Sequence, residues 1–158
     1  MSLRRKLING LTVVLIVLLA GCGSEPLSKE VQLQKDLDQM EVLAEAKKTS
    51  ELMSYFHESF KPEGGWNKKD IQRMLHFRFL KHKTVHVTKV VKDIEWQSDD
   101  EVKVTVVAAL AGSPIADLAK LTEARAQLMK FDVVLKREDA HFMVRSVQWA
   151  HAYPTDFL

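Results

Sequence analysis

Cys22 is the residue whose neighbours point most clearly to a chemical reaction, and it is the only cysteine of this 158-residue chain. It follows Leu19, Ala20 and Gly21. The small residues before it let a peptidase approach the backbone. The thiol can then accept a diacylglyceryl group, and the amine freed by cleavage can accept a third acyl chain. Because several acyl chains anchor a protein stably, the spacing predicts lipid attachment at Cys22.

The residues before Cys22 have the composition of an export signal. A cationic start, Arg4-Arg5-Lys6, precedes an uncharged apolar segment over 11–20 that is shorter than a membrane-spanning helix. The sequence Leu19-Ala20-Gly21-Cys22 resembles the lipobox of bacterial lipoproteins. This resemblance implies a signal peptide over residues 1–21 and a lipidated tether over 22–30. Two alternatives stay open: a short transmembrane anchor, and a free or intermolecularly bonded thiol at Cys22.

The same resemblance predicts where the protein resides. In lipoproteins, an Asp directly after the lipidated cysteine retains the protein in the inner membrane, and this chain has Gly23 there. The resemblance therefore implies a lipid-anchored protein of the cell envelope. In a Gram-negative source it would sit in the outer membrane and face the periplasm.

Removal of the predicted signal peptide changes the net charge. The whole chain has 23 basic and 21 acidic residues, a formal net charge of +2. Without Arg4, Arg5 and Lys6 it has 20 basic and 21 acidic residues, a net charge of −1. The sequence therefore offers no electrostatic reason to expect a nucleic-acid partner.

The histidines do not form a metal-binding pattern. His76, His82 and His86 lie close together in the sequence, but their spacings of six and four span an expected change from helix to strand. No Cys or Glu completes a recognised ligand set around them. We therefore expect neither a metal site nor a cofactor.

Apolar spacing predicts helices in the first half of the remaining chain. Ser28 is a suitable N-cap, and apolar residues follow at helical spacing as far as Phe60, in one long helix or in two joined near Thr49. The segment 61–65 contains a proline and paired glycines, which end a helix. Asn67 and Asp70 resemble a capping pair for a second, shorter helix.

Alternating apolar residues predict four strands in the second half, at about 82–97, 101–111, 124–138 and 140–150. A short helix is expected over 115–121, after Gly112-Ser113-Pro114. In the last strand, Phe142 and Val144 point to one face, whereas Val147 and Trp149 point to the other. Apolar residues on both faces indicate that the sheet is covered on one side and curved or partnered on the other.

Helices followed by an antiparallel meander resemble the nuclear-transport-factor-2-like fold. The last strand, Phe142-Met143-Val144-Arg145-Ser146-Val147-Gln148-Trp149, matches the aromatic, basic and hydrophobic residues and the tryptophan that often end such domains. This chain has Asp139-Ala140 where a glycine turn is usual. The resemblance implies a single α+β domain over 31–158, with N-terminal helices packed on a curved antiparallel sheet of about four strands that forms a cone.

The cone of enzymatic members of this fold holds an acid paired with a histidine or a tyrosine. The candidate cavity residues in this chain are Tyr55, His86, Glu95, Asp132, His141 and Arg145. Asp132 and Arg145 lie on successive predicted strands, which favours a cross-strand ion pair on the solvated face. A buried acid–histidine contact in a deep pocket would favour catalysis. A cone plugged by Met129, Phe131 and Trp149 would favour a binding role.

The sequence therefore predicts an exported lipoprotein with a non-enzymatic binding or assembly module at the periplasmic face of the envelope. Its expected partners are the membrane, through Cys22, and an envelope protein or a small hydrophobic ligand. The alternative is a small cone-shaped enzyme or carrier for a hydrophobic ligand. Trp66, Trp96 and Trp149 can line a pocket or pack in the core. The C-terminal Phe157-Leu158 either folds back or docks on a partner.

Overall fold

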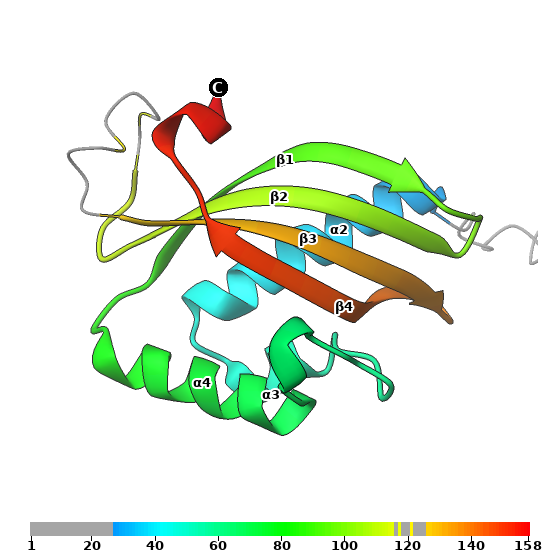
Figure 1. The fold of residues 1–158 in the computed structure, drawn as a ribbon, viewed down its shortest axis with the longest axis horizontal. Coiled ribbons are helices and arrows are strands. Elements are labelled where there is room, and N and C mark those ends of the chain that lie inside the picture. Colours follow the sequence, from blue (N-terminus) through cyan, green and yellow to red (C-terminus); the bar gives the residue numbers. More distant parts are fainter. Residues whose placement is uncertain (1–26, 116, 118–120, 122–125) are drawn as a thin grey trace, which may run out of the picture.

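The structure is a computed structural model that describes residues 27–115, 117, 121 and 126–158 (Figure 1). Its helices are α2 (Lys29–Glu45), α3 (Thr49–Met53) and α4 (Lys68–Lys81), and its strands are β1 (His86–Trp96), β2 (Glu101–Ala111), β3 (Gln127–Glu138) and β4 (His141–His151). The short 3₁₀ helices are η1 (Glu63–Gly65) and η3 (Pro154–Phe157). Helices precede strands along the chain, which confirms the predicted α+β class.

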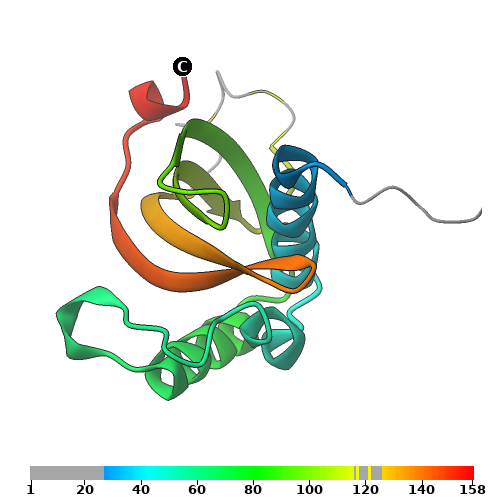
Figure 2. The ribbon, with the colours of Figure 1, turned by 90° about the vertical axis from the view of Figure 1, so that its right-hand side faces the viewer.

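The four strands form one antiparallel sheet in the order β1-β2-β3-β4. The sheet curves strongly, with α2 along one side and α3 and α4 below it (Figure 2). The pairing register shifts between Val91 and Asp93 on β1, and between Val134 and Leu135 where β3 meets β4. Bulges bend a strand and increase its twist, so these two shifts account for much of the curvature. The predicted cone of about four strands is confirmed.

The first helical region consists of two helices. The hydroxyl of Ser28 accepts a hydrogen bond at the start of α2, as an N-cap does. Lys47 adopts a left-handed conformation, with φ of 57°, which ends the α2 segment before α3 begins at Thr49. The two-helix interpretation is therefore confirmed. The helix was also expected to continue through Phe60, and this is wrong because α3 ends at Met53.

The segment 55–61 lies along the edge of β4 instead of continuing the helix. The amide of Val144 donates to the carbonyl of Tyr55 at 2.7 Å, and the carbonyl of Val144 accepts from the amide of His57 at 3.0 Å. Lys61 donates to the next carbonyl on β4 at 2.9 Å. β4 is an edge strand, and its free backbone groups form hydrogen bonds with this segment that a helix could not form. These bonds explain why residues 55–61 are not helical although their apolar residues have helical spacing.

The start of α4 follows the prediction. The side chain of Asn67 accepts hydrogen bonds from the amides of Lys69 and Asp70, and the carboxylate of Asp70 accepts one from the amide of Asn67 at 3.1 Å. This reciprocal capping box satisfies amides that the first helical turn leaves free. It also fixes where the loop before the helix must end.

A bulge changes the faces predicted for β4. Arg145 is the extra residue, because the partners of β3 continue on either side of it. Strict alternation predicted that Val147 and Trp149 point to one face of β4 and Phe142 to the other. In the structure, Val147 and Trp149 pack against the same core cluster as Phe142, so that assignment is wrong. One inserted residue reverses the side-chain alternation beyond it.

The convex face of the sheet is covered at one end by the C-terminal residues. Val107 and Ala109 of β2 are buried there in a cluster with Leu128 and Phe157. Phe157 therefore folds back onto the sheet, one of the two outcomes expected for the C-terminus, while Leu158 remains exposed. Apolar residues on both faces of β2 thus have separate clusters to pack in.

Some predictions fall outside the described residues. These are the signal peptide over 1–21, most of the tether over 22–30, and most of the short helix over 115–121. Within the described residues, no helix is long and apolar enough to cross a membrane. The buried members of the three core clusters lie between Leu33 and Phe157, so a chain that starts at Ser24 retains this core.

Lys89 of β1 joins the sheet to α2. Its ammonium lies 2.7 Å from Oδ1 of Asp38 and also contacts the carboxylate of Glu41. Burial lowers the pKa of Lys89, but hydrogen bonds to both carboxylates outweigh this, so the pKa is raised. The hydrogen bond from Lys89 holds the pKa of Asp38 below its ordinary value. The cluster therefore stabilises the folded state at neutral pH.

We expect Lys89→Met to lower the free energy of unfolding at pH 7 by about 1 kcal/mol, because the cluster is partly exposed to solvent. Because the pKa of Asp38 is lower in the folded state, its ionised carboxylate stabilises the fold above pH 3.8. This contribution is lost as the pH falls through the lowered pKa. The difference between the two proteins should therefore shrink below pH 3.8. Urea titrations across this range measure it, with Lys48→Met, at an exposed pair with Glu51, as the control. A constant difference would contradict this origin.

Candidate binding site

Apolar side chains fill the space between the curved sheet and α2. Val104 of β2, Leu135 of β3 and Phe142 of β4 are shielded from solvent, and Leu33 of α2 packs against them. The ring of Trp96 meets that of Phe142 at a centroid distance of 5.7 Å. This region is a packed core, and a ligand would have to displace side chains to enter it.

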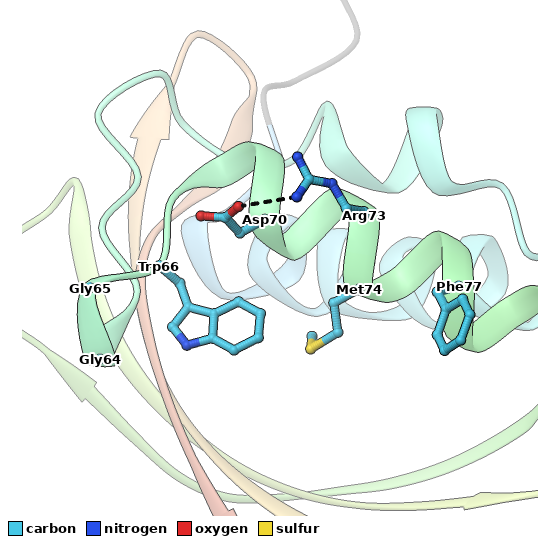
Figure 3. A pocket seen from close by; sticks show the side chains of 7 residues that line it. All are labelled: Gly64, Gly65, Trp66, Asp70, Arg73, Met74 and Phe77. Carbon is cyan, nitrogen blue, oxygen red and sulfur yellow. Dashed lines mark ion pairs between the residues drawn. The ribbon is translucent and has the colours of Figure 1, made fainter.

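A groove opens beside η1 and α4 (Figure 3). Its volume is about 580 Å³. Trp66 follows η1, and Met74 and Phe77 come from α4; the three side chains point toward the same space. Trp66 also packs edge to face against Trp149 of β4, with ring centroids 6.3 Å apart. The groove is thus an apolar site that adjoins the cone.

Two glycines form the turn that positions Trp66. Gly64 and Gly65 have φ of 80° and 77°, a left-handed conformation that glycine adopts at least cost. A Cβ atom on Gly64 would lie 3.4 Å from Cδ1 of Trp66. The capping box of Asn67 begins immediately afterwards. Trp66 is therefore held between a tight turn and a fixed helix start.

Charged side chains form the rim of the groove. Arg73 lies 3.9 Å from Asp70, one helical turn earlier on α4, and its side chain is largely exposed. The ammonium of Lys81 lies 4.4 Å above the ring of Phe77, a cation–π contact. An apolar molecule in the groove would therefore have cations beside it.

A separate polar cluster lies where α2 meets the beginning of β4. Asp36 is only 1% exposed. Its Oδ1 lies 2.8 Å from Nδ1 of His141 and accepts a hydrogen bond from Nε2 of Gln32 at 3.0 Å, and its Oδ2 accepts one from the amide of Phe142 at 2.8 Å. A buried carboxylate needs such partners. Asp36 therefore links α2 to the β3–β4 hairpin.

Tyr55 completes this cluster. Its ring meets that of His141 edge to face at 6.0 Å, and a cavity of about 340 Å³ lies beside both. Burial raises the pKa of the Tyr55 hydroxyl, and the charge of Asp36 adds to this. A carboxylate at Nδ1 orients a histidine for proton transfer at Nε2. However, 53% of the His141 side chain is exposed, and the cluster shares no residue with the lining of the groove.

The structure brings together two of the six predicted cavity residues, Tyr55 and His141. Nδ1 of His86 lies 3.9 Å from Oε1 of Glu45 on α2. Glu95 is exposed on β1, opposite Lys103. The six residues do not belong to the set that lines the groove.

The remaining two lie on or near the convex face. Asp132 accepts a hydrogen bond from Oγ1 of Thr105 at 2.6 Å, and its cross-strand neighbour is Gln148. Arg145 occupies the bulge of β4. The predicted cross-strand ion pair between Asp132 and Arg145 is therefore wrong, because β3 and β4 pair Asp132 with Gln148, three residues beyond Arg145.

Another histidine, His57, contacts a residue that is distant in the sequence. Nε2 of His57 lies 2.5 Å from Oε1 of Glu138, and its Nδ1 accepts a hydrogen bond from the amide of Ser59 at 2.8 Å. The pair ties the segment 55–61 to the end of β3. In the described part of the chain, no three His, Cys, Asp or Glu side chains come close enough to hold a metal ion.

Sequence reasoning missed Asp36, although a signal was present. Asp36 lies beside Leu33 and Leu37 on the apolar face of α2. An acid on the buried face of an amphipathic helix must find polar partners. Of the groove, the sequence indicated only Trp66, as one of three tryptophans able to line a pocket. The exposure of Phe77 depends on what α4 packs against, and the helical pattern alone does not show this.

Neither the family models nor the curated proteins compared with this sequence match it. Solved structures do match the fold. A proposed scytalone dehydratase from Novosphingobium aromaticivorans has a TM-score of 0.65 and 9% identity, over 79% of this chain and 85% of that one. A proposed dehydratase of the nuclear-transport-factor-2-like family from Streptomyces avermitilis has a TM-score of 0.58 and 13% identity, over 81% and 99%.

A nuclear-transport-factor-2-like protein of unknown function from Shewanella oneidensis has a TM-score of 0.53 and 12% identity, over 73% of this chain and 97% of that one. The fold is nuclear-transport-factor-2-like. At these identities the likeness concerns the fold alone. Because two of these three neighbours are named as dehydratases and one has no known function, the function must be argued from the sites of this chain.

Proposed function

We propose that this protein is a lipid-anchored envelope lipoprotein whose folded body is a non-enzymatic binding module. The anchor is Cys22, and Gly23 directs the protein to the outer membrane, facing the periplasm, in a Gram-negative source. The binding site is the groove lined by Trp66, Met74 and Phe77, and its ligand is apolar.

The observation that carries this proposal is the contrast between a filled cone and an open apolar groove. Ligand sites are concave, mostly apolar and about 300–1,000 Å³ in volume, and the groove has about 580 Å³. Within the described residues, the buried polar side chains are those of Gln32, Asp36 and Thr49, which belong to α2 and α3. The groove therefore supports apolar binding better than acid–base chemistry.

We expect the chain from Ser24 onward to bind the fluorescent fatty acid cis-parinaric acid, and Met74→Glu to weaken this binding at least about tenfold, since a carboxylate would lose its hydration in an apolar site. Fluorescence titration measures the Kd. Val42→Glu is the matched control, because Val42 is 54% exposed on α2, away from the groove. Equal weakening by both variants would count against the groove.

We expect Cys22→Ala to leave an uncleaved precursor that takes up no labelled palmitate, because the thiol that accepts the diacylglyceryl group is absent. Gel mobility and labelling in growing cells give the two readouts. Ser24→Ala, two residues further on, should be labelled normally. Normal labelling of Cys22→Ala would rule out the proposed anchor.

A second candidate function is catalysis at the cluster of Asp36, His141 and Tyr55, which supports the alternative of a small cone-shaped enzyme. The hydrogen bond between Asp36 and His141 favours it. NMR of the His141 imidazole distinguishes the two candidates. A ligand in the groove should leave its signals unchanged, whereas a substrate beside Tyr55 should shift them.

A further inference from the structure

One side of α4 leaves large apolar side chains in solvent. Phe77 is 59% exposed and Leu80 is 71% exposed, whereas Ile71 and Phe79, on the other side of the helix, are buried. A surface helix ordinarily turns its polar residues outward. Neighbouring exposed apolar side chains of this size mark an interaction surface.

The same side of α4 carries positive charge. Lys69, Arg73 and Lys81 are exposed, and helical spacing places them on the same side as Phe77 and Leu80. We call these five residues the α4 outer face.

The charge of this region differs from that of the rest of the body. Residues 68–83 include six Lys or Arg and one Asp, whereas the other residues from Cys22 onward include 14 basic and 20 acidic residues. In the described part of the chain, salt bridges involve two of the six cations, Lys68 with Glu58 at 3.6 Å and Arg73 with Asp70 at 3.9 Å. The region is therefore a basic patch on an otherwise acidic body.

The combination of apolar and basic side chains identifies the partner. The ammonium of Lys81 lies 4.4 Å above the ring of Phe77, so charge and apolar surface are presented together. Helices that lie in the plane of a membrane surface carry Phe and Leu beside Lys and Arg, so that apolar burial and attraction to anionic lipids add together. Each basic residue near such a surface raises the affinity about fivefold.

We propose that the α4 outer face docks on an anionic phospholipid leaflet, with α4 in the plane of the interface. This extends the proposed anchoring at Cys22. The six peptide units between Cys22 and Ser28 span at most about 20 Å, so an anchored body stays within reach of the leaflet. Phe77 lines the groove as well, so docking would open the groove towards the lipid.

The test uses the chain from Ser24 onward, which lacks the anchor. Vesicles of phosphatidylcholine mixed with phosphatidylglycerol should retain it in flotation, whereas vesicles of phosphatidylcholine alone should not, and added NaCl should weaken the binding. Leu80→Ser should lower the affinity at least about fivefold by removing apolar contact. Lys69→Gln with Lys81→Gln should lower it more than about tenfold by removing two charges.

Controls are matched in exposure and chemistry. Val42→Ser on α2 and Lys48→Gln before α3 should leave vesicle binding unchanged. Equal loss in these controls and in the α4 variants, or equal binding to both kinds of vesicle, would overturn the proposal. It would also be overturned if sedimentation showed a dimer that Leu80→Ser dissociates, because the face would then bind a second copy of the chain.

This outcome is separable from the proposed function. Leu80 does not line the groove, so Leu80→Ser should still bind cis-parinaric acid as the unmodified body does. Vesicle binding without fatty-acid binding would support the docking face and contradict the groove. Fatty-acid binding without vesicle binding would support the groove and contradict the docking face.

Discussion

Phe142→Ala should lower the free energy of unfolding by about 3–5 kcal/mol, a loss typical of removing a large aromatic side chain from a core. The side chain is fully buried where the sheet, α2 and the ring of Trp96 meet. Its removal leaves a cavity that the neighbouring strands can close only in part. Because small domains have only about 5–15 kcal/mol of stability, the variant should be close to unfolding at physiological temperature.

Urea denaturation of the chain from Ser24 onward measures this effect, with Phe77→Ala as the control. Both substitutions remove the same atoms, but Phe77 is 59% exposed. We expect the control to change the free energy of unfolding by no more than about 1 kcal/mol. A similar loss in both variants would mean that Phe142 is not at the centre of the core.

Asp36→Ala should lower the free energy of unfolding by about 3 kcal/mol, since it leaves three donors, two of them buried, without their acceptor. Those donors are Nε2 of Gln32, the amide of Phe142 and the ring nitrogen of His141. Asp36→Asn should cost less, because its carbonyl oxygen can still accept one of these hydrogen bonds.

Denaturation curves of both variants give the comparison, and Asp38→Ala is the control on the same helix. The side chain of Asp38 is 55% exposed, and its ion pair with Lys89 should contribute at most about 1 kcal/mol. A stable Asp36→Ala variant would show that the polar cluster is dispensable for folding, and the catalytic alternative would then gain weight.

Sequence predicted best the elements whose signals are local. The strand predicted over 101–111 coincides with β2, since polar turn residues bound its alternating valines. The cap of α4 was predictable because Asn67 and Asp70 lie within one turn. Each signal depends on neighbours in the chain, so no tertiary contact was needed to interpret it.

Features that depend on distant residues were not accessible in this way. Asp36 meets His141, 105 residues later, and no spacing rule connects them. The bulge at Arg145 breaks the alternation on which the predicted face of Trp149 depended. The groove exists because α4 buries Ile71 and leaves Phe77 outside, and that choice is made by packing.

The backbone pairing of segment 55–61 with β4 has a consequence for crowding. Anchored proteins share a thin layer above the membrane, where copies meet far more often than in dilute solution, and an open strand edge invites a neighbour to add a strand. Here the amide and the carbonyl of Val144 already form hydrogen bonds with the backbone of Tyr55 and His57. This stretch of β4 is thus closed to strand addition, so on a protein anchored as we propose it would not join neighbouring copies.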